Sequence, residues 1–131
     1  MVKKIFFAAL LSFLLIAPAV YSADFQNIDT GAVREKIDSQ TYGLILDVRT
    51  PREYSGTLGH IKGSKLIPIQ ELEKKWEEIV AYKNKKVIVY CKSGGRSAKA
   101  SAFLKEKGFE HIENMLGGMM EWNKRGYPVE R

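Results

Sequence analysis

The sequence predicts a single α/β domain with a mainly parallel central sheet and helices on both faces. Two observations carry this expectation: short apolar segments alternate with helix-forming segments along residues 24–131, and residues 87–90 are apolar on both faces. Such alternation is typical of βα units, and a strand that is apolar on both faces suits a sheet covered from both sides. The 131 residues, 45% of them hydrophobic, suffice for one domain with its own core.

The first half of this domain is expected to contain one regular helix, two strands and a long loop. The helix has apolar side chains four positions apart behind a capping residue, and the first strand is a continuous apolar run. A proline fits the first turn of the brief helix, and three glycines mark the loop. In order, we expect a helix from Asp29 or Thr30, a strand at 44–48, a brief helix from Pro51, a loop at 55–63 and a strand at 66–67.

The second half is expected to contain three helices and two strands. The first of these helices would bury a stripe formed by Leu72, Trp76, Ile79 and Val80. Gly108 stands where a C-terminal helix cap belongs. After the stripe we expect a strand at 87–90, a turn at 91–95, a helix at 96–107, a strand at 109–116 and a short helix at 119–124.

Residues 1–23 have the layout of a secretory signal peptide. Lys3 and Lys4 precede an apolar stretch over residues 5–16, and small residues allow cleavage after Ser22 or Ala23. The stretch is shorter than the roughly 20 residues that span a bilayer, although an uncleaved N-terminal anchor is the alternative. We therefore expect residues 24–131 to form a periplasmic or secreted domain without a stable membrane anchor.

Composition narrows the classes of function. The chain has 21 Lys and Arg against 15 Asp and Glu, and removal of Lys3 and Lys4 leaves an excess of four. Basic and acidic side chains are interspersed, which disfavours nucleic-acid binding but suits a small anionic substrate. One cysteine excludes an internal disulfide framework, and neither metal-ligand spacing nor a nucleotide-binding glycine motif is present. We expect no metal and no cofactor.

The segment Cys91-Lys92-Ser93-Gly94-Gly95-Arg96 carries the predicted chemistry. It follows the most apolar strand, and α/β sheets bind ligands beyond the carboxyl ends of their strands. The glycines permit a tight curl, so that backbone N–H groups at a helix start converge on the sulfur, and the two cations add charge. These effects favour a thiolate with a pKa below about 8.5, which is a nucleophile. The alternative is an inert buried thiol.

Five segments resemble, in the right order, motifs of the rhodanese family of sulfurtransferases. They are Leu46-Asp47-Val48-Arg49 with Glu53-Tyr54, Gly59-His60-Ile61-Lys62-Gly63-Ser64, Ile67-Pro68, Cys91 to Ser97, and Leu116-Gly117-Gly118 with Trp122 and Gly126-Tyr127-Pro128-Val129. The resemblance implies a single rhodanese domain. It also implies that Cys91 takes a sulfane sulfur from a donor such as thiosulfate, forms a persulfide, and passes the sulfur to cyanide, a thiol or another protein.

The resemblance also implies roles for individual residues. Cys91 would be the sulfur carrier, and the backbone N–H groups of Lys92, Ser93, Gly94, Gly95 and Arg96 would form its cradle. Arg96 would close the loop and add charge, and Lys92 would contact an anionic donor. Asp47 and Arg49 would form an ion pair that braces the loop, and His60 would be structural. Four residues, 55–58, stand between Tyr54 and Gly59, where the usual family pattern has about two. We expect this longer loop to border the substrate pocket.

Other functions stay open at this point. A non-enzymatic carrier that delivers sulfur to a partner protein would use the same loop. A phosphatase or an arsenate reductase would also use a cysteine in an anion-binding loop, but cysteine phosphatases generally place five residues between Cys and Arg, whereas four stand here. A thiol–disulfide oxidoreductase is disfavoured because no second cysteine can resolve a mixed disulfide. The protein is expected to be a monomer or a weak dimer.

Overall fold

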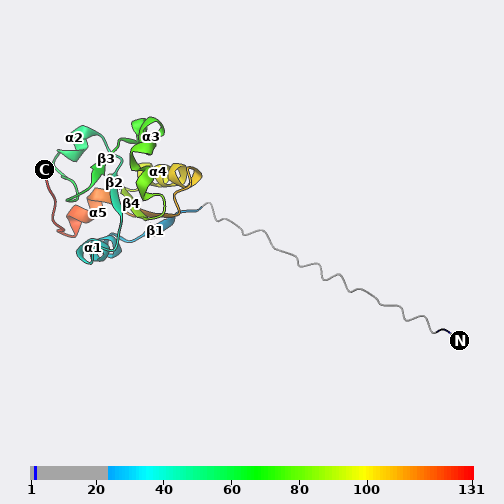
Figure 1. Cartoon of the computed structure of the whole chain (residues 1–131). Helices are drawn as coiled ribbons and strands as arrows, with labels where there is room; N and C mark the ends of the chain where they lie inside the picture. The colour runs from blue at the N-terminus through cyan, green and yellow to red at the C-terminus, as the bar shows by residue number, and fades with distance from the viewer. Residues whose placement is uncertain (1, 3–23) are drawn as a thin grey trace.

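Five strands in the order β1-β5-β4-β2-β3 form the centre of the structure, a computed structural model that describes Val2 and residues 24–131 (Figure 1). All four neighbouring pairs are parallel, which confirms the predicted sheet. The strands are β1 (Gln26–Ile28), β2 (Leu44–Asp47), β3 (Lys65–Leu66), β4 (Lys86–Tyr90) and β5 (His111–Met115).

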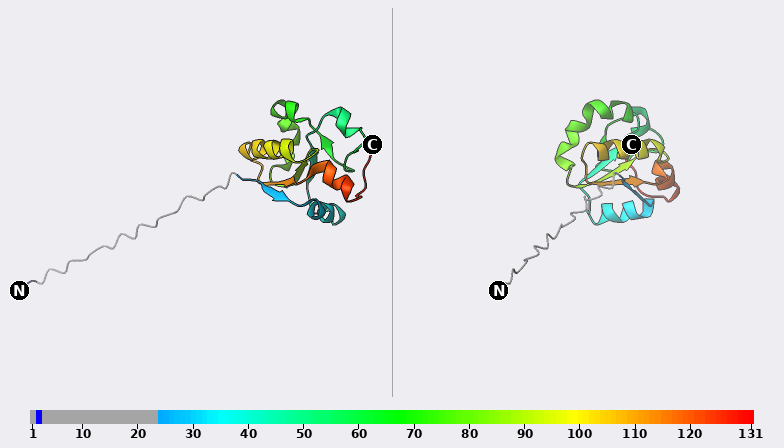
Figure 2. Two further views of the ribbon diagram at one scale, coloured as in Figure 1. Left: turned by 180° about the vertical axis from the view of Figure 1, so that it is seen from behind. Right: turned by 90° about the vertical axis from the view of Figure 1, so that its right-hand side faces the viewer.

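Helices cover both faces of the sheet, as predicted (Figure 2). One core cluster packs Leu72, Ile79 and Leu104 against one face, and the other packs Val33 and Trp122 against the opposite face. The helices are α1 (Thr30–Asp38), α2 (Pro51–Tyr54), α3 (Ile69–Lys75), the 3₁₀ helix η1 (Trp76–Tyr82), α4 (Gly95–Glu106) and α5 (Gly118–Lys124).

One strand was not expected, and two expectations about these elements were wrong. The polar segment Gln26–Ile28 is a strand, β1, that pairs with β5 at the edge of the sheet. The expected helix with the apolar stripe is divided into α3 and η1, and in η1 Ile79 is buried whereas Val80 is 47% exposed. A 3₁₀ helix has three residues per turn, so the 3.6-residue spacing used for the prediction no longer holds there. The last strand is shorter, since β5 begins at His111.

The predicted signal peptide, residues 1–23, lies outside the described residues apart from Val2 and stays a prediction. Across residues 24–131 the longest and most apolar helices fall short of what a bilayer crossing requires.

The parallel register brings three chain segments together at the carboxyl ends of the strands, which we call the carboxyl edge of the sheet. Asp47 lies beside Tyr90, so β2 and β4 end at the same level, and β5 ends next to β4. The segments that follow these strands therefore begin side by side: Arg49 after β2, Cys91 after β4 and Leu116 after β5. Ligands of parallel sheets bind at this edge.

Candidate active site

The loop after β4 wraps its backbone around the sulfur of Cys91. Gly94 has a φ of 107°, a left-handed conformation that turns the chain into α4. Its N–H donates to Sγ of Cys91 at 3.0 Å, and the hydroxyl of Ser97 lies 3.3 Å from the same sulfur. Gly95 has no positive φ and open space where a Cβ would lie, so only Gly94 of this pair is required for the turn.

The thiol is buried, as the inert alternative requires, but its hydrogen bonds favour the thiolate, as the activated interpretation requires. Cys91 is 1% exposed and belongs to the core cluster on one face of the sheet. Burial raises the pKa of Cys91, but hydrogen bonds from the Ser97 hydroxyl and from the N–H groups of Ser97, Gly94 and Ser93 outweigh it. The net effect lowers the pKa and favours the thiolate.

Arg96 does not present a free positive charge to a substrate. Its two terminal nitrogens donate to the carboxylate of Glu53 at 2.7 and 2.8 Å. The hydrogen bond to Arg96 is the main cause that lowers the pKa of Glu53 from 4.5 to about 2. Glu53 also caps α2 through Thr50, so one carboxylate joins α2 to the first turn of α4. No site role was predicted for Glu53 from the sequence, because its partner is 43 positions away.

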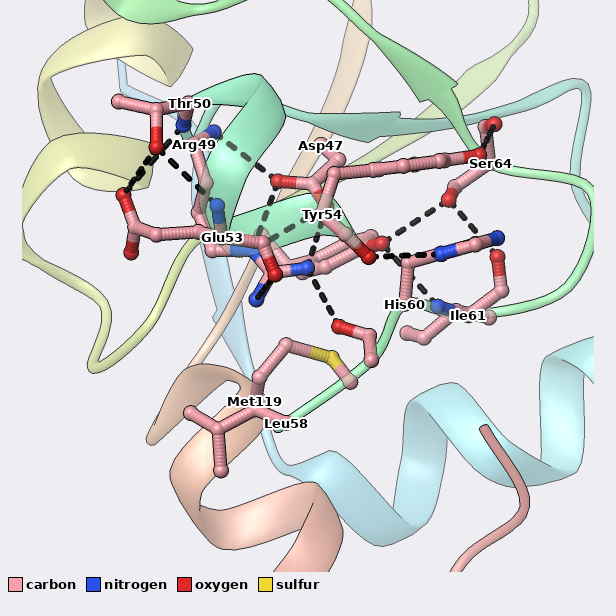
Figure 3. Close-up of polar contacts among 12 residues, drawn as sticks. Asp47, Arg49, Thr50, Glu53, Tyr54, Leu58, His60, Ile61, Ser64 and Met119 are labelled. Atoms are coloured by element: carbon pink, nitrogen blue, oxygen red, sulfur yellow. Dashed lines mark hydrogen bonds and ion pairs between the residues drawn. The ribbon is translucent and has the colours of Figure 1, made fainter. Parts of the chain in front are cut away.

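Asp47 and Arg49 form an ion pair that is almost completely buried (Figure 3). Nη2 of Arg49 lies 2.7 Å from Oδ2 of Asp47, and Nε lies 3.0 Å from Oδ1. The same Nη2 donates to the carbonyl of Gly59 at 2.7 Å. Through this hydrogen bond the ion pair fixes the loop that follows α2. The pair also lies next to the end of β4, because Asp47 is paired with Tyr90 in the sheet.

A cavity of about 380 Å³ opens beside these residues. The lengthened loop borders it, as expected. Its lining consists of Arg49, Arg52, Glu53, Gly56, Thr57, Leu58 and Lys92. Arg49 and Arg96 have carboxylate partners, whereas Lys92 and Arg52 form no ion pair within residues 24–131. Two uncompensated cations therefore stand at the cavity.

The turn between β5 and α5 supports the Cys91 loop from the other side. The N–H of Met119 donates to the carbonyl of Cys91 at 2.9 Å, and the N–H of Met120 donates to that of Lys92 at 3.0 Å. Gly118 has a φ of 56°, and a Cβ there would lie 2.4 Å from the carbonyl carbon of Lys92. In the sequence, only the adjacent glycines Gly117 and Gly118 indicated that this turn comes close to another segment.

His60 lies in a separate polar network. Its ring stacks on that of Tyr54 with 3.6 Å between centroids, and Nδ1 is 2.9 Å from the carbonyl oxygen of Tyr54 (Figure 3). Its other ring nitrogen, Nε2, lies 3.6 Å from the carboxylate of Glu130, so both ring nitrogens have protein partners. This arrangement fits a structural role and not that of a general base.

Comparisons with known proteins agree with this geometry. Residues 29–125 match the model of the rhodanese-like domain. A sulfurtransferase of Allochromatium vinosum is 30% identical over 102 residues, which cover 78% of this chain and 92% of that protein. YrkF of Bacillus subtilis, named as a candidate sulfur carrier protein, is 35% identical over 101 residues, 77% of this chain and 52% of that protein.

Solved structures show the same fold. The crystal structure of a rhodanese-related protein from Thermoplasma volcanium superposes with a TM-score of 0.71 and 37% sequence identity. The match covers 81% of this chain and 98% of that one. The chain belongs to the rhodanese-like domain family, in which its relatives include a sulfurtransferase and a candidate sulfur carrier.

Proposed function

We propose that the protein moves sulfane sulfur from an anionic donor such as thiosulfate to cyanide or a thiol, through a persulfide on Cys91. The observation that carries this proposal is the Gly94 N–H at 3.0 Å from Sγ, with the lowered pKa of the thiol. A thiolate attacks the outer sulfur of thiosulfate, the S–S bond of the donor breaks, and sulfite leaves with the bonding electrons. The acceptor then attacks the outer sulfur of the persulfide, and Cys91 leaves as a thiolate.

The cavity gives the donor a place for its charge. Lys92 lines the cavity next to Cys91 in the chain, and Arg52 lines it from α2, both without a carboxylate partner in the described part of the chain. Because only 1% of Cys91 is exposed, the donor's outer sulfur has to enter the loop while its oxygens stay near these cations. Charge attraction of this kind raises the local concentration of a small anion.

The tie between Arg96 and Glu53 argues against phosphatase chemistry. A phosphate cradle uses its arginine to donate to phosphate oxygens. Here both terminal nitrogens of Arg96 already donate to a carboxylate. Turnover of aryl phosphates that is lost in Cys91→Ser would contradict this reasoning.

Mass spectrometry of the protein after incubation with thiosulfate tests the proposal. We expect a gain of one sulfur in the wild type and no gain in Cys91→Ala. An unchanged mass in the wild type would overturn the proposed donor chemistry. A stoichiometric persulfide with negligible thiosulfate:cyanide turnover would instead identify a sulfur carrier, a role that the similarity to YrkF supports.

We also propose that the domain works in the periplasm or outside the cell, after removal of residues 1–22 or 1–23. The support is the charged start, the apolar stretch and the small residues at the junction. N-terminal sequencing of the mature protein should begin at Ala23 or Asp24. Full-length protein in the cytoplasmic fraction would contradict the proposal.

A further inference from the structure

Exposed apolar side chains gather next to the Cys91 loop. Within residues 24–131, three large apolar side chains are exposed: Val80 (47%), Leu116 (47%) and Met120 (53%). Isolated exposed apolar residues are ordinary on protein surfaces. Leu116 and Met120, however, both belong to the turn between β5 and α5, which contacts the loop that carries the reactive thiol.

Met120 is held firmly beside the exposed part of that loop. Its N–H donates to the carbonyl of Lys92 at 3.0 Å, and the preceding N–H donates to that of Cys91 at 2.9 Å. Gly118 approaches Lys92 so closely that no Cβ would fit between them. The backbone of Met120 therefore keeps a fixed place beside the Cys91 loop, and its side chain is exposed there.

Leu116 is fixed at both of its backbone polar groups. Its N–H donates to the carbonyl of Ile28 at 2.9 Å, and its carbonyl accepts from the hydroxyl of Thr30 at 2.7 Å. The next residue, Gly117, lies against Gly94 of the Cys91 loop, since a Cβ on Gly94 would be 3.6 Å from the Gly117 nitrogen. Both exposed apolar residues thus stand at the carboxyl edge of the sheet, where sulfur would leave the protein.

Around this turn, acidic side chains have ion-pair partners, whereas one lysine has none among the described residues. The nearby carboxylates are engaged, since Glu53 binds Arg96 and Glu121 binds Arg125. Lys92, which accepts the hydrogen bond from the Met120 backbone, forms no ion pair among the described residues. The face therefore combines a free cation with apolar side chains, which is complementary to a partner that carries acidic and apolar groups.

We propose that Leu116, Met120 and Lys92 form the docking surface for a protein acceptor whose cysteine is flanked by acidic and apolar residues. A small inorganic donor gains nothing from apolar side chains, because its oxygens stay hydrated, whereas a polypeptide that covers them removes apolar area from water. The inference rests on the proposed function. The acceptor thiolate attacks the outer sulfur of the Cys91 persulfide, a new S–S bond forms on the acceptor, and Cys91 leaves as a thiolate.

Sulfur transfer to three short peptides tests the docking surface. They are Glu-Leu-Cys-Leu-Glu, its basic counterpart Lys-Leu-Cys-Leu-Lys and its polar counterpart Glu-Ser-Cys-Ser-Glu. The protein is first loaded with inorganic polysulfide, and the loss of its extra sulfur is followed by mass spectrometry. We expect the acidic, apolar peptide to take sulfur about tenfold faster than either of the others, a difference of about 1.4 kcal/mol in barrier.

Variants show whether this surface sets the preference. The double variant Leu116→Ser, Met120→Ser should lose the preference for leucine over serine in the peptide, with turnover of thiosulfate and cyanide unchanged. Val80→Ser, which removes an equally exposed side chain from η1, should keep the preference. Lys92→Glu should reverse the charge preference.

The two proposals fail in different ways. Equal rates for the three peptides, or a double variant that keeps the preference, would overturn the docking surface alone. Loading by polysulfide but not by thiosulfate would overturn the proposed donor and leave the peptide comparison decisive. A protein that gains no sulfur from either source would overturn both.

Discussion

Replacing Glu53 by glutamine removes the charge that holds Arg96 and tests whether this ion pair stabilises the active-site loop. Glutamine keeps the shape and the capping capacity at this third helical position, so α2 should stay capped. The fall in the pKa of Glu53 from 4.5 to about 2 corresponds to about 3 kcal/mol, and hydrogen bonds from Thr50 supply part of it beside the main contribution from Arg96. The two side chains are 31% and 29% exposed, so solvent screening reduces the expected loss to roughly 1–2 kcal/mol.

The pH dependence gives a second measure of the same pair. A carboxyl group whose pKa is depressed in the folded state stabilises that state fully above its unfolded pKa, here 4.5. This contribution disappears as the pH falls toward 2. Urea unfolding at pH 7 and at several values below 4.5 should therefore show a difference between wild type and Glu53→Gln that shrinks with acidification.

Glu71→Gln is the matched control. Glu71 pairs with Lys75 at 3.5 Å within one helix, and about half of each side chain is exposed. Exposed pairs of this kind contribute about 0.3–0.5 kcal/mol. If Glu53→Gln costs no more than Glu71→Gln at pH 7, or if its difference from wild type is the same at every pH, the ion pair does not hold the loop and the reasoning fails.

Three further predictions concern the loop itself. Gly118→Ala should lower the free energy of unfolding by more than about 2 kcal/mol and slow persulfide formation, since its Cβ would meet the loop backbone at 2.4 Å. Gly63→Ala is the control, because Gly63 has a φ of 79° but open space around it, and thermal unfolding should show a loss of only about 1 kcal/mol. Ser97→Ala should move the midpoint of the pH profile for Cys91 alkylation to higher pH, because a hydroxyl 3.3 Å from the sulfur is lost; an unmoved midpoint would count against that contact. Added salt should raise the KM for thiosulfate, because it screens the charge of Lys92, and should leave the midpoint of the alkylation profile unchanged. A KM that does not depend on salt would contradict the role of Lys92 in attracting the donor.

Hydrophobic periodicity predicted the buried strands but did not predict β1, the strand at one edge of the sheet. Residues 44–48 and 87–90 are apolar because both of their faces are covered, so hydrophobicity reveals them. β1 is Gln-Asn-Ile, with two exposed residues, and pairs with β5 through backbone hydrogen bonds that any residue except proline can make. One side-chain hydrogen bond, from Asn114 to Asn27 at 2.9 Å, adds to this pairing. No alternation of apolar residues marks such a strand.

The sequence predicted the Cys91 loop because its determinants are local. A strand, a glycine with a left-handed φ and a helix start lie within a few residues, and together they direct N–H groups at the sulfur. The contacts of Glu53 and Met119 with the loop depend on chain segments 43 and 28 positions from their partners, so spacing could not reveal them. The sequence also could not show that Cys91 would be both buried and activated.

The sequence predicted that both Lys92 and Arg96 would add positive charge beside Cys91, and the structure separates the two. Arg96 is neutralised by Glu53, and the main groups that lower the pKa of Cys91 are backbone N–H groups and the Ser97 hydroxyl, not charged side chains. These groups donate directly to the sulfur at hydrogen-bond distance, so added salt screens them little. Lys92 forms no ion pair among the described residues and lines the cavity, where it can attract the substrate. Activation and attraction are therefore assigned to different groups, and a single loop can hold an anionic sulfur while it draws in another anion.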